Sequence, residues 1–285
     1  MALHTRWKLD LPSDQEEAVC AWLDDQGASA YYREADPPHT FFAYFPPDQD
    51  VPAAAGLKAF PGVALVEQEA FADEDWLAKS REGFGSFDVG RRFFVRPLWE
   101  ETPAAEGRMA LVVNPGLAFG TGGHETTRLC LELLEHLADA GELRGPVLDI
   151  GAGTGILALG AHLLGAKDIA AFDIDPDCGP AMAELVEMNQ HLLHRVKPFE
   201  AFVGTLEDPR VKGPYQLLLA NILLETIQEL LPRMAQIAAP GGRLVASGIL
   251  AEREDEALLS LVSAGFKPLK VLREGEWIAI LAERA

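Results

Sequence analysis

The stretch VLDIGAGTGILALG, residues 147–160, is a short apolar run that leads into three glycines at alternate positions, Gly151, Gly153 and Gly155. A glycine-rich turn after a buried strand is typical of proteins that bind a nucleotide-like cofactor, because glycine lets the backbone turn tightly and approach the ligand. A phosphate-binding P-loop requires a lysine directly after its last glycine. No lysine follows Gly155 until Lys167, so the spacing excludes a P-loop and leaves a dinucleotide or S-adenosylmethionine.

In the segment AAFDIDP, residues 170–176, Asp173 stands at the end of a second expected strand and lies 22 residues after Gly151. An acidic side chain at this point can accept hydrogen bonds from both hydroxyls of an adenosine ribose, which fits NAD and S-adenosylmethionine alike. The alternative is that Asp173 is a surface carboxylate. The Tyr-x-x-x-Lys motif of short-chain dehydrogenases is absent, because none of the four tyrosines has a lysine four positions later. The catalytic pattern therefore favours S-adenosylmethionine.

A third run, LLLANILLET, places Asn221 at the carboxyl edge of the expected sheet, where ligands of open α/β sheets bind. The side-chain oxygen of an asparagine can accept a hydrogen bond from an amine that is to be methylated. The alternative is that Asn221 only caps the start of the next segment. We expect Asn221 to act both in catalysis and in cofactor binding.

From about residue 128 onward, apolar runs alternate with helix-like stretches. The runs are PVLDIG, DIAAFDID, FEAFVG, YQLLLANI and GRLVASGI, which begin at residues 146, 168, 199, 215 and 242. Strands that alternate with helices predict an α/β fold with a parallel, doubly wound sheet. The last part, FKPLKVLREGEWIAILAE at 266–283, consists of two β-rich runs joined by a short turn at Glu274 and Gly275. We therefore expect an antiparallel hairpin to close the sheet.

Residues 1–71 are predicted to form a separate unit with the element order βαββαβ, which is typical of a ferredoxin-like α+β domain. Its first helix is expected to begin at Ser13, which forms a capping box with Glu16. The sequence of this unit holds no glycine loop, nucleophile motif or metal cluster, so its expected role is recognition or scaffolding. Residues 72–90 are acidic and then glycine-rich, and we expect a linker there before the main domain at 91–285.

The formal net charge of the 285-residue chain is −20, which would repel nucleic-acid phosphates and attract basic proteins, or serve solubility alone. No apolar run approaches the roughly 18 residues that cross a bilayer, and the N-terminus has no signal-peptide pattern. We expect a cytoplasmic protein without membrane or direct nucleic-acid partners. The three cysteines form no CxxC pair and HExxH is absent, so we predict neither a disulfide framework nor a metal site.

Taken in order, these motifs resemble those of the ribosomal protein L11 methyltransferase family, class I S-adenosylmethionine enzymes that methylate amines of that protein. The most specific segment is NPGLAFGTGGHETTRLCLELLE at 114–135, a loop that leads into a helix. The glycine stretch, DIDP, ANIL, SGIL and EGEW follow in the family's order and spacing, and DEDW is similar to the family's linker. The resemblance covers nearly the whole chain.

This resemblance implies a Rossmann-like methyltransferase domain, an N-terminal domain that recognises the substrate, and S-adenosyl-L-methionine as cofactor. The implied substrate is the basic ribosomal protein L11, methylated on lysine side-chain amines, the N-terminal amine or both, and we expect a monomeric enzyme. Thr127, Gly151, Asp173 and Asn221 match the family's cofactor-binding positions, and Gly153 is added from the glycine loop.

Two segments depart from the family's pattern. The family commonly reads GTGTHPTT where this chain has Gly123 and Glu125 in place of a threonine and a proline. After ANIL, a small residue and a proline are replaced by LETI. These changes bear on the acceptor pocket, so one alternative is a methyltransferase of the same fold that acts on another protein or a small molecule. A second is an NAD-binding module without methyl transfer.

The sequence offers no obvious dedicated general base. His124 is the nearest candidate, in a loop whose Gly120, Gly122 and Gly123 would let it move as a lid. Histidine is the most frequent general base in enzymes, so a catalytic role for His124 stays open. We favour a role in ordering the loop, because only the adjacent Glu125 is evident as a carboxylate partner.

Overall fold

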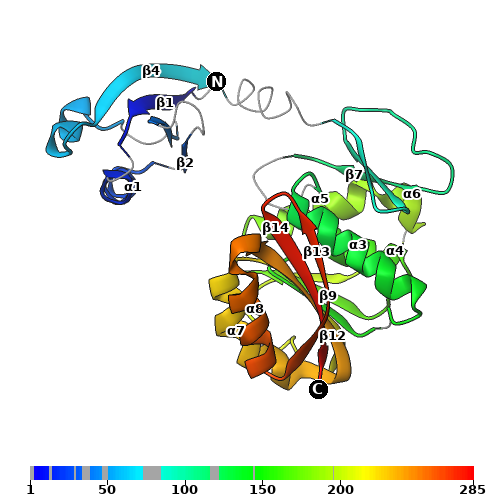
Figure 1. Ribbon diagram of the computed structural model, residues 1–285. Helices are drawn as coiled ribbons and strands as arrows, with labels where there is room; N and C mark the ends of the chain where they lie inside the picture. The colour runs from blue at the N-terminus through cyan, green and yellow to red at the C-terminus, as the bar shows by residue number, and fades with distance from the viewer. Residues whose placement is uncertain are drawn as a thin grey trace. The chain divides into compact units, whose positions relative to one another are not determined.

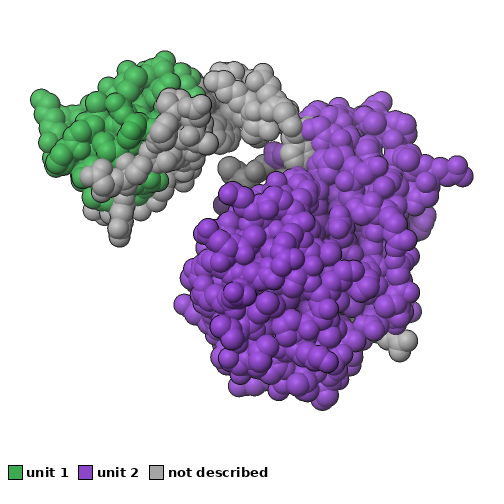
Figure 2. All heavy atoms as spheres, in the orientation of Figure 1, with its two compact units in different colours: residues 1–82 green, residues 83–285 purple. Residues whose placement is uncertain are grey.

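The computed structural model describes residues 3–12, 15–28, 30–33, 39–46, 51–72, 85–115, 122–143, 145–194 and 196–285. The chain divides into two compact units, residues 1–82 and 83–285, which Figure 2 distinguishes by colour. The capping box expected at Ser13 and the DEDW segment lie outside the described residues. In the part of the chain that the structure describes, no helix has the length and apolar character needed to span a bilayer.

The N-terminal unit combines a four-stranded antiparallel sheet with a helix and a 3-10 helix. In chain order the elements are β1 (Leu3–Asp10), α1 (Glu16–Asp25), β2 (Ala30–Arg33), β3 (Thr40–Phe45), η2 (Ala54–Ala59) and β4 (Ala64–Ala72). The sheet order is β2-β3-β1-β4, and each neighbouring pair is antiparallel. This order agrees with the predicted ferredoxin-like arrangement, except that the second helix is reduced to η2.

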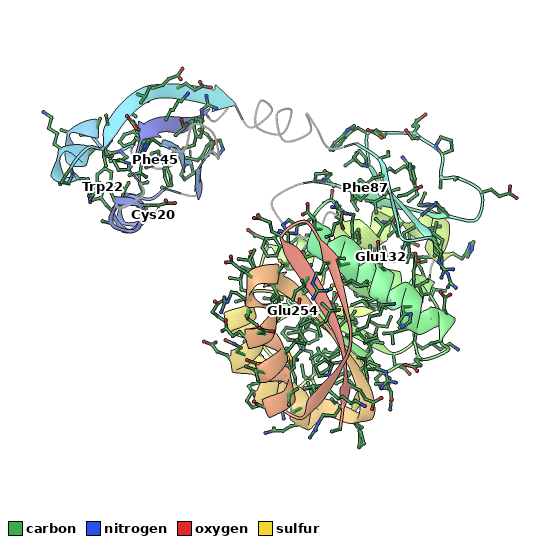
Figure 3. All side chains as sticks on the ribbon, viewed as in Figure 1. Cys20, Trp22, Phe45, Phe87, Glu132 and Glu254 are labelled. Atoms are coloured by element: carbon green, nitrogen blue, oxygen red, sulfur yellow. The ribbon has the colours of Figure 1, made fainter. Side chains whose placement is uncertain are left out.

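Aromatic side chains build a separate core in this unit. The Trp7 ring stacks on Trp22 and meets Phe45 edge-on, with ring centroids 6.5 and 5.1 Å apart. Figure 3 labels Trp22 and Phe45 in this unit. Both Trp7 and Phe45 are fully buried. A Cβ at Gly56 of η2 would lie 2.5 Å from Cζ2 of Trp22, so glycine lets this segment pack directly on the indole.

The second unit is built on a seven-stranded sheet with the order β10-β9-β8-β11-β12-β14-β13. Figure 1 shows its two C-terminal strands, β13 and β14, in red and side by side. Its strands are β8 (Val147–Ile150), β9 (Ile169–Asp173), β10 (Glu200–Val203), β11 (Tyr215–Asn221), β12 (Ala238–Leu250), β13 (Phe266–Glu274) and β14 (Trp277–Arg284). The first five strands in this order run parallel, and β14 and β13 add an antiparallel hairpin. The α/β sheet and its terminal hairpin, predicted from the sequence, are confirmed.

Helices cover both faces of this sheet, and the residues of β11 show why. Leu217 and Leu219 enter the core shared with α3, α4 and α5, whereas Leu218 and Ala220 enter the core shared with α7 and α8. Successive side chains of a strand point to opposite faces, so an apolar strand needs cover on both sides. The helices are α3 (Glu125–Asp139), α4 (Ile156–Leu163), α5 (Cys178–Met188), α6 (Gln190–Leu193), α7 (Leu224–Ile237) and α8 (Glu254–Ser263), with the 3-10 helix η3 (Ala251–Arg253).

A smaller sheet precedes α3, formed by β5 (Phe87–Val89), β6 (Phe93–Pro97) and β7 (Met109–Val113). Two buried polar side chains hold it against the helices. The Glu135 carboxylate accepts from the N–H groups of Arg91 and Arg92 at 2.9 and 2.8 Å. The Asn189 side chain pairs with the N–H and C=O of Val112 at 2.9 and 2.8 Å. Strand β5 falls within the range 72–90 that the sequence assigned to the linker.

The strand order reverses beside β8, which has β9 on one side and β11 on the other. In open α/β sheets, the loops that leave the carboxyl ends of strands diverge at such a point and leave a crevice in which ligands bind. Gly151, Asp173 and Asn221, which were predicted to bind the cofactor, stand at or directly after the carboxyl ends of these three strands and therefore lie at one edge, whereas Thr127 belongs to α3.

Candidate active site

The glycine loop follows β8 directly, and its three glycines all have positive φ angles, which L-residues with a side chain rarely adopt. The angles are 67° at Gly151, 55° at Gly153 and 83° at Gly155. A Cβ at Gly151 would lie 2.4 Å from Cγ2 of Ile222, so the loop also packs closely against the segment after β11. Gly155 is the N-cap of α4, which places the positive end of that helix at this edge of the sheet.

Asp173 ends β9 beside this loop, with its carboxylate held by two backbone groups. Oδ2 accepts from the N–H of Gly153 at 2.9 Å, and Oδ1 accepts from the N–H of Asp175 at 3.0 Å. Each carboxylate oxygen can accept a further hydrogen bond. The side chain is therefore oriented but keeps acceptor capacity for a ribose diol, and Gly153 and Asp173, predicted from separate motifs, are in contact.

A second carboxylate, that of Asp149 in β8, was not singled out from the sequence. It is buried, and its Oδ2 accepts from the N–H of Ala158 in α4 at 3.0 Å. Burial raises the pKa of Asp149 to about 7, the Ala158 N–H opposes that shift, and the nearby Asp173 charge adds to it. The signal in the sequence was an acidic residue inside the apolar run VLDI, which is costly to bury without a purpose.

The Asn221 side chain lies half-buried at the end of β11 and meets the first turn of α3. Its Nδ2 donates to Oγ1 of the buried Thr127 at 3.3 Å. The other atom of the amide, Oδ1, is buried and has no hydrogen-bond partner within the described ranges. A buried acceptor without a donor costs about 1–3 kcal/mol, so this oxygen suits a donor that a ligand supplies.

A cavity of about 240 Å³ lies beside the Asn221 amide. Its lining comes from four separate segments: His124 and Thr126, Asn221 to Leu223, Gly248, and Trp277. Pockets for drug-sized ligands measure roughly 300–1,000 Å³, so this cavity suits one inserted side chain better than a whole nucleoside cofactor. Apolar groups of Ile222, Leu223 and Trp277 surround a few polar atoms.

His124 both caps α3 and contributes to the cavity wall. Its Nδ1 accepts from the N–H of Thr126 at 3.3 Å and lies 2.9 Å from Oγ1 of Thr126. Because Nδ1 accepts from a backbone N–H, the neutral ring carries its proton on Nε2. The imidazole meets Trp277 edge-on with ring centroids 4.9 Å apart, and its Nδ1 is 3.9 Å from the Glu125 carboxylate.

The sequence predicts no individual role for Thr126, Ile222, Leu223, Gly248 or Trp277 of the cavity wall, and the last three are the most informative. The available signal was their place in ANIL, SGIL and EGEW. Gly248 has a φ of 82°, and a Cβ there would lie 2.3 Å from the carbonyl oxygen of Ile222, so only glycine fits where β12 passes this loop. Of the glycines expected to form a lid, Gly120 lies outside the described residues.

Comparisons with known proteins point to one family. Residues 9–285 match the family model described as "Ribosomal protein L11 methyltransferase (PrmA)". The ribosomal protein L11 methyltransferase of Pelobacter propionicus is 36% identical, over 99% of this chain and 98% of that protein. The protein of the same name from Geotalea daltonii is 40% identical, over 73% of this chain and 67% of that protein.

A solved structure gives the same answer. The crystal structure of ribosomal protein L11 methylase from Lactobacillus delbrueckii subsp. bulgaricus matches with a TM-score of 0.62 and 29% identity, over 70% of this chain and 99% of that chain. The match to the family model extends through both units of the chain, from β1 to the C-terminus. The chain therefore belongs to the ribosomal protein L11 methyltransferase family, a family of S-adenosylmethionine-dependent methyltransferases.

Proposed function

We propose that this chain transfers methyl groups from S-adenosylmethionine to lysine side-chain amines, the N-terminal amine or both, in ribosomal protein L11. The observation that carries the proposal is the buried Oδ1 of Asn221, which lacks a hydrogen-bond donor among the described residues and borders a cavity of side-chain size. An amine that enters this cavity would supply the missing donor. The names of the relatives support ribosomal protein L11 as the acceptor.

The residues at the sheet edge fit this cofactor. The Asp173 carboxylate retains acceptor capacity for the two ribose hydroxyls, and Gly151 and Gly153 let a ligand approach the backbone. Thr127 holds the Asn221 amide in one orientation. When bound, S-adenosylmethionine supplies an electrophilic methyl group. The chain's own residues must then bring a neutral amine to that group in the right direction.

Neutrality is the harder requirement for lysine. With a pKa near 10.4, a lysine amine costs roughly 4–5 kcal/mol to keep neutral at pH 7, whereas an α-amine with a pKa near 8 costs only about 1.4 kcal/mol. The apolar groups of Ile222, Leu223 and Trp277 remove water from the amine, and desolvation lowers the pKa of an ammonium group. Asn221 Oδ1 accepts an N–H from the amine and so directs its lone pair.

His124 has a structural role in this proposal. Its Nδ1 is engaged by the N–H of Thr126, so the imidazole orders the start of α3 and packs against Trp277. The competing role, general base catalysis, would require the ring to take a proton from the amine. We further propose that the N-terminal unit recognises the intact substrate, since the described residues that line the cavity all belong to the second unit.

The acidic chain, with a net charge of −20, suits a basic protein substrate and not a nucleic acid. A cytoplasmic, monomeric enzyme is part of the same proposal. The test is to incubate the purified chain with S-adenosylmethionine and ribosomal protein L11 and to measure the intact mass. We expect increments of whole methyl groups, and peptide mapping then assigns them to lysines or to the N-terminus. An unmodified L11 beside a methylated second protein or small molecule would support the alternative acceptor.

A further inference from the structure

Arg128 of α3 joins three segments that are distant in the sequence. Its Nε and Nη2 donate to Oε1 of Glu274, in the turn between β13 and β14, at 3.0 and 2.6 Å, and Nε also reaches Oε2 at 3.2 Å. Its Nη1 donates to the carbonyl oxygen of Gly123, in the loop before α3. The guanidinium carbon lies 5.9 Å from the ring centroid of Phe87 in β5. Figure 3 labels Phe87.

A second contact, between His124 and Trp277, joins the start of α3 to the β13–β14 hairpin one helical turn from Arg128. His124 and Arg128 are four residues apart and therefore lie on one side of the helix start. Trp277 stands three residues after Glu274, and its ring meets that of His124. His124 and Trp277 line the cavity beside Asn221, whereas Arg128 is outside its lining. The Arg128–Glu274 pair thus holds together two segments that each supply a wall of the cavity.

We infer that Arg128 is a positioning residue: it acts as a latch that ties the β13–β14 turn to the start of α3 and so holds the Trp277 ring against His124 in the wall of the acceptor cavity. This inference rests on the proposed function, because it takes the cavity as the place where the amine enters. The pair is partly open to solvent, with 21% of the Arg128 and 40% of the Glu274 side chain exposed, so the latch can open without unfolding the core.

The choice of arginine follows from its shape. One planar guanidinium contacts a carboxylate through two nitrogens and a carbonyl through the third. A lysine ammonium is a point charge on a flexible stem and cannot hold both partners in this geometry. Arg128→Lys therefore keeps the charge but should lose the fixed spacing between Gly123 and Glu274.

The chain offers a matched control at the other end of β14. Arg243 of β12 forms ion pairs with Glu283 of β14 and with Glu142, which follows α3. Its side chain is 15% exposed, close to the value for Arg128, and no member of this group lines the cavity. Arg243→Ala thus removes a similar arginine with two ion pairs at the far end of β14, away from the residues that line the acceptor cavity.

The first measurement is steady-state methylation of intact ribosomal protein L11. Arg128→Ala and Glu274→Ala should each lower kcat/KM on the order of 10- to 100-fold, the range expected for a misplaced catalytic wall. The double variant should be no worse than Arg128→Ala, and Arg128→Lys should recover only part of the loss. S-adenosylhomocysteine affinity and the activity of Arg243→Ala should stay close to those of the parent chain.

The second measurement observes the environment of the Trp277 ring directly. The chain has five tryptophans, and in protein labelled with 5-fluorotryptophan the fluorine resonance that disappears in Trp277→Phe identifies Trp277. That resonance should shift or broaden in Arg128→Ala and stay unchanged in Arg243→Ala. If Arg128→Ala fails to fold, Glu274→Gln removes the charge and keeps the shape, and it should move the same resonance.

Three results would overturn the latch: additive losses in the double variant, an equal loss of activity in Arg243→Ala, or a Trp277 resonance that neither Arg128→Ala nor Glu274→Gln moves. Failure of the proposed function looks different. A parent chain that binds S-adenosylhomocysteine and leaves L11 unmodified would refute the acceptor, while a Trp277 resonance that still depends on Arg128 would support the latch.

Discussion

The carboxylate of Asp173 accepts a hydrogen bond from the N–H of Gly153 at 2.9 Å, which ties the end of β9 to the glycine loop after β8. The other carboxylate oxygen is held by the N–H of Asp175. The acidic side chain is therefore oriented before a ligand arrives, and such preorganisation reduces the entropy that binding would otherwise cost.

Replacement of Asp173 should weaken cofactor binding strongly. Asp173→Ala removes charge-assisted hydrogen bonds to the ribose worth roughly 2–4 kcal/mol and frees the glycine loop at Gly153. The dissociation constant of S-adenosylhomocysteine, measured by calorimetry, should rise on the order of 30- to 1000-fold. Asp173→Asn keeps one acceptor oxygen, so its dissociation constant should lie between those of the parent chain and Asp173→Ala. An unchanged constant in a folded Asp173→Ala protein would remove Asp173 from the site.

Removal of the N-terminal unit should separate cofactor binding from recognition of the protein substrate. A truncated protein that lacks residues 1–82 keeps the second unit with both of its cores, so it should fold and bind S-adenosylhomocysteine. It should not methylate intact ribosomal protein L11. Full activity toward L11 from the truncated protein would show that the N-terminal unit serves another purpose.

Asn221 should matter more for turnover than for cofactor affinity. Asn221→Ala removes an acceptor that is used most fully in the transition state. The activation free energy should therefore rise by about 1–3 kcal/mol, which lowers kcat roughly 5- to 150-fold. The dissociation constant of S-adenosylhomocysteine should change far less. Thr127→Val, which removes the acceptor of the Asn221 amide but keeps its shape, should lower kcat by a smaller factor. The opposite pattern, a large loss of cofactor affinity at constant kcat, would assign Asn221 to the cofactor alone.

The pH profile should report on the substrate and not on His124. Without a dedicated base, the fraction of neutral amine controls the rate, so kcat/KM should rise about tenfold per pH unit below the pKa of the amine. His124→Ala should keep this slope, because the ring is engaged as the cap of α3. A plateau near neutral pH in the parent that vanishes in His124→Ala would identify the imidazole as the base.

The buried Asp149 should make stability depend on pH in a defined direction. Its pKa is raised from 3.8 to about 7, so between these values the folded chain binds the proton more tightly than the unfolded chain. The stability from the protonated carboxyl is therefore present at low pH and lost as the pH rises toward about 7. In Asp149→Asn this titration is gone. The Tm of the variant relative to the parent should increase from pH 4 to 7 and level off above, and a constant difference would contradict the shift.

Local patterns in the sequence predict the architecture of the main domain and the group of residues at one edge of its sheet. Apolar runs that alternate with helix-like stretches predict the parallel sheet, and the turn at Glu274 and Gly275 predicts the hairpin. Gly151, Asp173 and Asn221 could be predicted to lie together because each stands at the end of a readable strand, and the carboxyl ends of parallel strands share one edge. These features depend on local patterns, which a single sequence displays.

The contacts among these residues, and the side chains that enclose them, depend on long-range packing that no local pattern displays. Asn221 contacts Thr127 from 94 positions away, and Arg128 contacts Glu274 across 146. Periodicity describes whether a residue faces a core, but it carries no information about its partner on another element. That choice follows from the strand order, which places β11 beside β8 and brings the hairpin against the start of α3, so Trp277 became a wall of the cavity only through packing.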